Sequence, residues 1–143
     1  MQIQNVLSSA SPYLRFFFFC DSVVQRDDRQ IDVTGLLSDC LFTNVPIQMP
    51  PCELTFTMVV GIHSEDRFAT YALKVTAQDK GKPEEPIWRS QIGLINDQYK
   101  PIKIQSYDVT FRQPGTYWFN AYLDGELAGR YPLTVEYAPM STS

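Results

Sequence analysis

His63 is the single histidine of the 143-residue chain, and the acidic segment SED follows it directly. Catalysis by a Ser-His-Asp or Cys-His arrangement needs a nucleophile that the fold holds beside the imidazole, and no residue near His63 is fixed in that way. The sets His63, Glu65, Asp66 and Cys40, Cys52, His63 also lack the paired close spacings of zinc sites. No glycine-rich phosphate-binding loop is present. We therefore expect no enzyme activity, no catalytic residue, no metal and no cofactor.

A row of aromatic and amide side chains on one strand is a better candidate for a binding site than His63 is for a catalytic one. In TYWFNAYL, the residues Trp118, Asn120 and Tyr122 share the strand face opposite Tyr117 and Phe119. Two rings that flank an amide are suited to stack a flat sugar or peptide and to hydrogen-bond it. The same row is equally suited to pack beneath a loop or against a second subunit. We take the row as a candidate ligand platform, with the other two readings left open.

The segment RFFFFCD, residues 15–21, raises the question of a membrane or lipid anchor. A spanning helix needs roughly 20 apolar residues, and this run is closed by Arg15 and Asp21 after five. A lipoprotein signal would place small residues before the cysteine, whereas Cys20 follows Phe19. The segment is therefore predicted to be a strand of a folded domain.

Alternation along this strand predicts two faces. The core face is expected to carry Leu14, Phe16, Phe18, Cys20 and Val24, with Cys20 as a small buried hydrophobe.

The opposite face would then expose aromatic rings and form an interface. The candidate interface residues are Tyr13, Phe17 and Phe19. Phenylalanine side chains left exposed to water lose the free energy of burial and promote aggregation, so a partner surface is expected to cover them. Either the segment NVPIQMPP or another subunit must cover them, and we favour the subunit.

Period-two patterns continue through the rest of the chain and predict an all-β fold. Apolar residues occupy the even positions of ELTFTMVVGI and the odd positions of ATYALKVTA, with HSEDRF as a hairpin loop between them. The apolar parity changes near Ser106, which predicts a β-bulge there. Asp124-Gly125 predicts a tight hairpin, whose register requires either a bulge at Gly129 or a three-residue loop.

Length and composition are those of one globular domain. The chain is 44% hydrophobic, 20% charged and 13% aromatic, and we divide it into an N-terminal segment 1–12, a domain 13–137 and a tail 138–143. The net charge of −4, without a cluster of basic residues, argues against nucleic acid and against anionic membranes as partners. The three cysteines cannot all form disulfides within one chain. No signal peptide is evident, so we expect a cytoplasmic protein. A disulfide between Cys40 and Cys52 stays open as an alternative.

Seven to nine short strands predict a two-sheet antiparallel sandwich. The stretch PGTYWF resembles the tyrosine corner of immunoglobulin-like domains, with Tyr117 alternatively an ordinary core residue. The motifs FFFFCDSVVQ, DVTGLL, PPCELTFTMVVGI and PGTYWFNAYLDGE resemble a family of small single-domain bacterial proteins of unknown function, over residues 13–137. This resemblance implies a β-sandwich and no catalytic residue.

Two functional classes follow. The first is a non-catalytic structural or protein-interaction domain that forms a homo-oligomer through an aromatic strand face, or binds another protein. The second is a carbohydrate-binding or small-ligand-binding module that uses the row at Trp118, Asn120 and Tyr122.

Overall fold

The computed structural model describes residues 12–26, 30–37, 40–43, 52–79, 81–111 and 115–137, with the backbone alone for 40–43, 52–54, 109–111 and 135–137. These residues form ten strands and no helix, so the described part of the chain contains no helix able to cross a membrane. The strands are β1 (Tyr13–Gln25), β2 (Ile31–Leu37), β3 (Cys40–Thr43), β4 (Cys52–His63), β5 (Thr70–Asp79), β6 (Glu85–Ile95), β7 (Gln98–Lys100), β8 (Ile102–Phe111), β9 (Gly115–Leu123) and β10 (Glu126–Tyr137).

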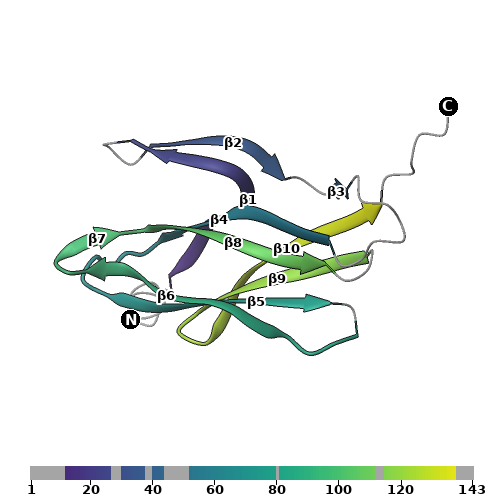
Figure 1. The fold of residues 1–143 in the computed structure, drawn as a ribbon. Helices are drawn as coiled ribbons and strands as arrows, with labels where there is room; N and C mark the ends of the chain where they lie inside the picture. The colour runs from purple at the N-terminus through teal and green to yellow at the C-terminus, as the bar shows by residue number, and fades with distance from the viewer. Residues whose placement is uncertain are drawn as a thin grey trace.

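The strands build two packed sheets (Figure 1). Sheet A has the order β2-β1-β4-β8, and sheet B has the order β3-β10-β9-β5-β6-β7. All described pairings are antiparallel except that of β3 with β10. The predicted all-β, two-sheet sandwich is confirmed, and the ten strands include two short ones, β3 with four residues and β7 with three.

The core lies between the sheets and follows the predicted alternation of β4, β5 and β9. Its buried members from these strands are Phe56, Met58, Val60, Ile62, Leu73, Val75, Tyr117, Phe119, Ala121 and Leu123. Trp88 of β6 packs against this cluster. Tyr117 is therefore a core residue, whether or not it also belongs to a tyrosine corner.

The β9–β10 hairpin confirms the prediction from Asp124-Gly125. Both turn residues have positive φ, 49° and 86°, which is the conformation of a type I′ turn. A register shift between Leu127 and Gly129 brings the apolar faces of the two strands into match. Of the two alternatives for this hairpin, the bulge is the one that the structure adopts.

Two local predictions are wrong. The segment HSEDRF is not a hairpin loop, because it leads from β4 in sheet A to β5 in sheet B. No bulge interrupts β8 near Ser106, since its pairing with β4 is continuous from Gly61↔Ile102 to Cys52↔Phe111. The parity changes there because β8 carries apolar side chains on both faces: Tyr107 packs on the core, and Ile104 pairs with Val59 on the opposite face.

The predicted faces of β1 are also wrong, because a bulge interrupts the strand. The register against β4 shifts between Leu14 and Phe16, so Leu14 packs on the core and, beyond the shift, Phe17 and Phe19 do. The Phe19 side chain is fully buried, with its ring centroid 4.8 Å from that of Phe56.

The even-numbered residues of the phenylalanine run face the opposite side of sheet A, away from the core. Phe16 and Phe18 lie half-buried there with their ring centroids 5.7 Å apart. Val24 is 62% exposed because β1 and β2 leave the sandwich together as a hairpin, at the top of Figure 1. Cys20 is fully buried, as predicted, and burial raises the pKa of its thiol, with a further increase from the neighbouring charge of Asp21.

Glycines on three other strands lie against side chains of β1. A Cβ placed on Gly61 of β4 would stand 2.3 Å from the Phe16 ring, and one on Gly129 of β10 would stand 2.5 Å from Leu14. On Gly35 of β2, the added atom would overlap the carboxyl group of Asp21. The absence of a side chain at these positions lets β1 sit close to three neighbouring backbones.

Candidate interaction surface

The outer face of sheet A carries apolar side chains on three successive cross-strand rungs. We call these residues the outer strip: Phe16, Gly61 and Ile102; Phe18, Val59 and Ile104; Leu36, Cys20, Thr57 and Ser106. None of them is charged. The outward face of an antiparallel sheet is normally polar, so an uncharged, largely apolar strip on that side is unusual.

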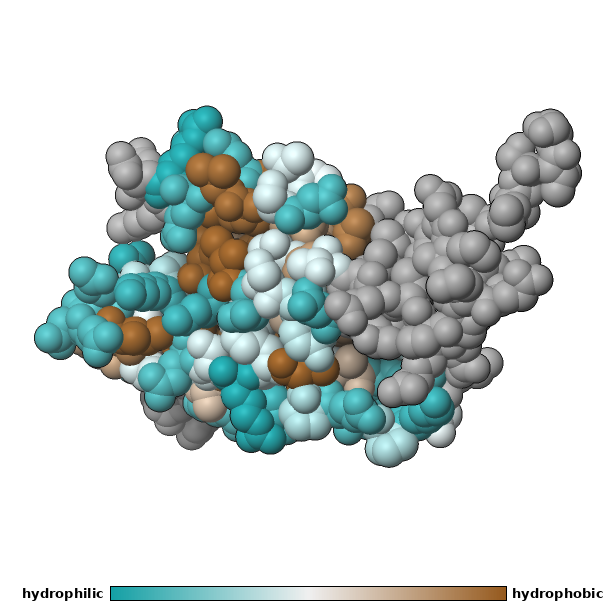
Figure 2. All heavy atoms as spheres, in the orientation of Figure 1, coloured by the Kyte–Doolittle hydropathy of each residue, from teal (hydrophilic) through white to brown (hydrophobic). Residues whose placement is uncertain are grey.

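The outer strip is accessible at its margins. Val59 is fully buried, whereas Phe18 and Ile104 are half-buried and Leu36 is 59% exposed. Figure 2 shows a brown hydrophobic band between the β1–β2 hairpin at the top of the view and β8 below it. An apolar band of this kind, with polar surroundings, is typical of a contact surface.

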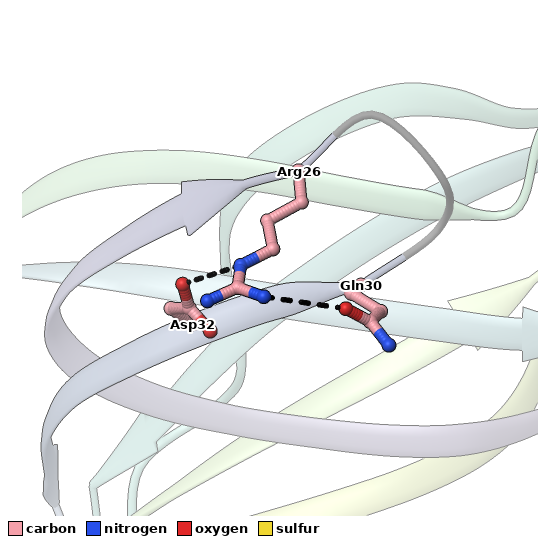
Figure 3. Close-up of polar contacts among 3 residues, drawn as sticks. All are labelled: Arg26, Gln30 and Asp32. Carbon is pink, nitrogen blue, oxygen red and sulfur yellow. Dashed lines mark hydrogen bonds and ion pairs between the residues drawn. The ribbon is translucent and has the colours of Figure 1, made fainter.

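Polar pairs border the outer strip at one of its ends and along the hairpin. Thr55 Oγ1 donates a 2.6 Å hydrogen bond to Asp108 Oδ1 on the rung beyond Thr57. In the hairpin, Arg26 Nε is 2.9 Å from Asp32 Oδ2, and its Nη1 donates to Gln30 Oε1 at 3.5 Å (Figure 3). An apolar centre with a polar border is the usual anatomy of a protein interface.

The structure separates the three predicted interface residues. Phe17 and Phe19 face the core. Their predicted assignment to an outward face was wrong because the β1 bulge reverses the two faces of the strand beyond Leu14. Tyr13 is 57% exposed, with its ring 5.2 Å from that of His63. The predicted core residues Phe16 and Phe18 take the outward place instead, which moves the candidate interface by one residue along the strand.

The outer face of sheet B holds the other predicted site. Asn120 is buried at 3% exposure between its neighbours in the row, Trp118 and Tyr122. Its Nδ2 donates to Glu84 Oε1 at 2.8 Å, and its Oδ1 accepts from Arg130 Nε at 2.8 Å. The amide that was expected to bind a ligand therefore already has partners on both sides.

Glu84, in the turn before β6, is the hub of this network. Its Oε1 accepts hydrogen bonds from Tyr122 OH at 2.6 Å and from Thr76 Oγ1 at 2.7 Å, in addition to the one from Asn120. The hydrogen bond from Tyr122, followed by that from Thr76, lowers the pKa of the Glu84 carboxyl group. The same bond raises the pKa of the Tyr122 hydroxyl group. The turn is thus fastened to β5 and β9 through one carboxylate oxygen.

A cation lies over each ring of the row. The guanidinium carbon of Arg130 is 4.1 Å from the Trp118 ring centroid, and Lys74 Nζ is 4.9 Å from that of Tyr122. These are cation–π distances. The row is therefore largely engaged within the chain, and sequence reasoning missed Glu84, Arg130 and Lys74, because contacts between a turn and two strands leave no local pattern.

The residues weighed for catalysis or metal binding, and not expected to serve either, are His63 with its acidic neighbours and two cysteines. His63 is exposed on its strand, and no three histidine, cysteine or acidic side chains gather within metal-binding reach among the described residues. The side chains of Cys40 and Cys52, the segment NVPIQMPP and most of the N-terminal segment lie outside the described residues.

Comparison with known families identifies the chain. A model described as a family of unknown function, DUF6941, matches residues 15–136. The chain belongs to this family. The resemblance to a family of unknown function is thereby confirmed. No curated protein matches the chain.

Several solved structures resemble this DUF6941 member at low identity. One is an alkylpurine DNA glycosylase of Pseudomonas fluorescens, with 9% identity and a TM-score of 0.44 over 91% of the chain. A β-glucosidase of Listeria innocua has 12% identity and a TM-score of 0.44 over 86% of it. The chain spans 32% and 16% of the lengths of these proteins. An immunoglobulin-like protein of Pseudomonas aeruginosa has 11% identity and a TM-score of 0.42, and the match covers 90% of this chain and 99% of that one.

Proposed function

We propose that the chain is a non-catalytic protein-interaction domain that associates with a second copy of itself through the outer strip. The observation that carries this proposal is the run of three uncharged rungs on an outward sheet face. Contact with a partner would remove the accessible parts of Phe16, Phe18 and Leu36 from water, which is favourable by about 25 cal/mol per Å².

Charge favours a second copy as the occupant. The chain has a net charge of −4, so two copies repel each other over most of their surfaces. The outer strip carries no charge, which lets it face its own image without placing like charges together. A flat sheet face also suits a two-fold contact, in which each copy presents the same patch.

The area of the outer strip determines how strongly two copies are expected to associate. Four strands about 4.8 Å apart and three rungs give an area on the order of 300 Å², less than the roughly 800 Å² per partner of a standard interface. The β1–β2 hairpin must therefore contribute the rim of the contact. We expect a weak dimer whose population rises with protein concentration.

The test compares two leucines of similar exposure on different sheets. Leu36 is 59% exposed in the outer strip, and Leu127 is 53% exposed in β10. Sedimentation at concentrations from about 1 µM to 1 mM should show a dimer for the wild type and for Leu127→Glu, and a monomer for Leu36→Glu. A monomeric wild type at all concentrations, or equal behaviour of the two variants, would sink the proposal.

The alternative, a carbohydrate-binding or small-ligand-binding module, rests on the row at Trp118, Asn120 and Tyr122. Its support is weaker because Arg130 and Lys74 already lie over the two rings. A sugar panel that shifts tryptophan fluorescence in the wild type, and not in Trp118→Leu, would favour it over self-association.

A further inference from the structure

A cavity of about 320 Å³ lies between the two sheets, beside β8, the edge strand of sheet A, and the part of β6 that precedes its pairing with β7. Figure 1 shows these two strands running one above the other at the front of the sandwich. The cavity is lined from both sheets, with Tyr107 and Asp108 from sheet A and Asp79, Glu85, Tyr117 and Phe119 from sheet B. Its volume reaches the lower end of the range of small-molecule sites, about 300–1,000 Å³.

The inner part of the cavity is aromatic. Phe119 is fully buried and Tyr117 is 8% exposed, so both belong to the core at the bottom of the cavity. Tyr107 of β8 and Ile87 of β6 also pack against the core from opposite sheets and form the walls. These surfaces suit a small apolar group, above all one whose positive charge can face a ring.

Carboxylates lie around the mouth. Glu85 pairs with Ala77 across the β5–β6 ladder and lies on the cavity side of β6, and among the described residues no lysine or arginine is paired with it. Asp79 ends the inner face of β5 and is 3.6 Å from Lys82 Nζ. Asp108 also carries a negative charge, although its carboxylate is turned toward Thr55, from which it accepts a hydrogen bond at the end of the outer strip.

The described residues of the lining carry three acidic side chains, Asp79, Glu85 and Asp108, against one lysine, so their net charge is negative. Burial, and then the charge of Glu85, raise the pKa of the Tyr107 hydroxyl group. Among the described residues of the lining, Lys82 is the one cationic residue, and its side chain is 58% exposed. An incoming cation can thus meet Glu85 directly and also approach Asp79, whose carboxylate contacts the exposed Lys82.

We propose that this cavity binds an organic cation, with an ammonium or guanidinium head against Glu85 and Asp79 and an apolar body against Tyr107 and Tyr117. The head would gain contacts with two carboxylates, and the body would pack on the rings of Tyr107 and Tyr117. A free amine and a lysine or arginine side chain of a peptide share this chemistry. The site is separate from the outer strip and does not depend on self-association.

The first experiment varies charge at constant shape. Benzylammonium, benzyl alcohol and phenylacetate are titrated into the full chain at neutral pH, and binding is followed by NMR shifts of the Tyr107 and Phe119 rings. Benzylammonium should bind with saturable shifts, benzyl alcohol about three- to fivefold more weakly, and phenylacetate not measurably. Equal binding of all three probes, or no saturation by benzylammonium, would overturn the proposal.

Matched variants locate the head group. Glu85→Gln should weaken benzylammonium binding about three- to fivefold and leave benzyl alcohol unchanged. Glu65→Gln, an exposed residue of the β4–β5 loop, should leave both unchanged, and thermal melting checks that each variant is folded. Unchanged amine affinity in Glu85→Gln would rule out the proposed pose.

The source of the cation is tested with N-acetyl-lysine methylamide against butylammonium, which carries the same head and stem. Tighter binding of the blocked lysine assigns the site to a protein side chain, and tighter binding of the free amine assigns it to a small molecule. If neither competes with benzylammonium, the inference fails for both sources.

Discussion

The hydroxyl group of Tyr122 donates a 2.6 Å hydrogen bond to Glu84 Oε1 and so fastens the β5–β6 turn to strand β9. Thr76 and Asn120 donate to the same oxygen from β5 and β9. One carboxylate in a turn thus holds two neighbouring strands of sheet B, and its charge contributes to stability.

This arrangement predicts a dependence of stability on pH. The pKa of Glu84 is lowered from its ordinary value of 4.5, first by the bond from Tyr122 and then by that from Thr76. A carboxyl group whose pKa is lower in the folded state stabilises the fold above its unfolded pKa, and this contribution is lost as the pH falls through the folded value. Urea unfolding between pH 7 and pH 3 should show a steeper loss for the wild type than for Glu84→Gln. Glu65→Gln should follow the wild type, and parallel curves for all three proteins would contradict the role of Glu84.

The faces of β1 predict an order of stabilities among phenylalanine variants. Phe19→Ala empties a fully buried space and should cost about 3–5 kcal/mol of unfolding free energy. Phe17→Ala should cost less and Phe18→Ala least, because Phe17 packs at the side of the core and Phe18 lies on the outer face. Chemical denaturation measures all three, and a larger loss for Phe18 than for Phe19 would restore the faces expected from simple alternation.

Close packing of Phe16 on Gly61 predicts a coupled pair of substitutions. The Cβ of Gly61→Ala would stand 2.3 Å from the Phe16 ring, so the ring must move, at a cost of about 1–3 kcal/mol. In a Phe16→Ala background the same substitution should cost almost nothing, which a double-mutant cycle detects. Strictly additive losses would show that the ring does not rest on this glycine.

The β9–β10 turn predicts a penalty that comes from backbone conformation alone. Gly125 has a φ of 86°, and no atom lies within 4 Å of an added Cβ. Gly125→Ala should therefore destabilise the protein by about 1–2 kcal/mol, and Gly125→Asn by less, because asparagine tolerates this conformation better. Thermal unfolding gives the comparison, and an unchanged melting temperature for the alanine variant would exclude a strained turn.

Prediction from sequence succeeded where one face of a strand meets the core. The alternation of Phe56, Met58, Val60 and Ile62 identified the inner face of β4, because Thr55 and Thr57 mark the opposite face at the start of the pattern. The turn chemistry of Asp124-Gly125 likewise identified a hairpin.

Prediction failed where the pattern carries no difference between faces. Four consecutive phenylalanines look the same in either parity, and the bulge near Arg15 that decides between them leaves no compositional mark. The hub at Glu84 was missed for another reason, since its partners Asn120 and Tyr122 lie 36 and 38 residues away in the chain. Contacts of that range depend on sheet order, which spacing along the sequence does not reveal.

The glycines that lie against β1 have a consequence for how this strand finds its register. A run of four identical residues cannot by itself distinguish one alignment against β4 from the next. Gly61, Gly129 and Gly35 each leave room for one particular side chain, respectively Phe16, Leu14 and Asp21. A strand shifted by one residue would bring different side chains to all three gaps. The information that aligns the phenylalanine run is thus stored on β4, β10 and β2, outside the run itself.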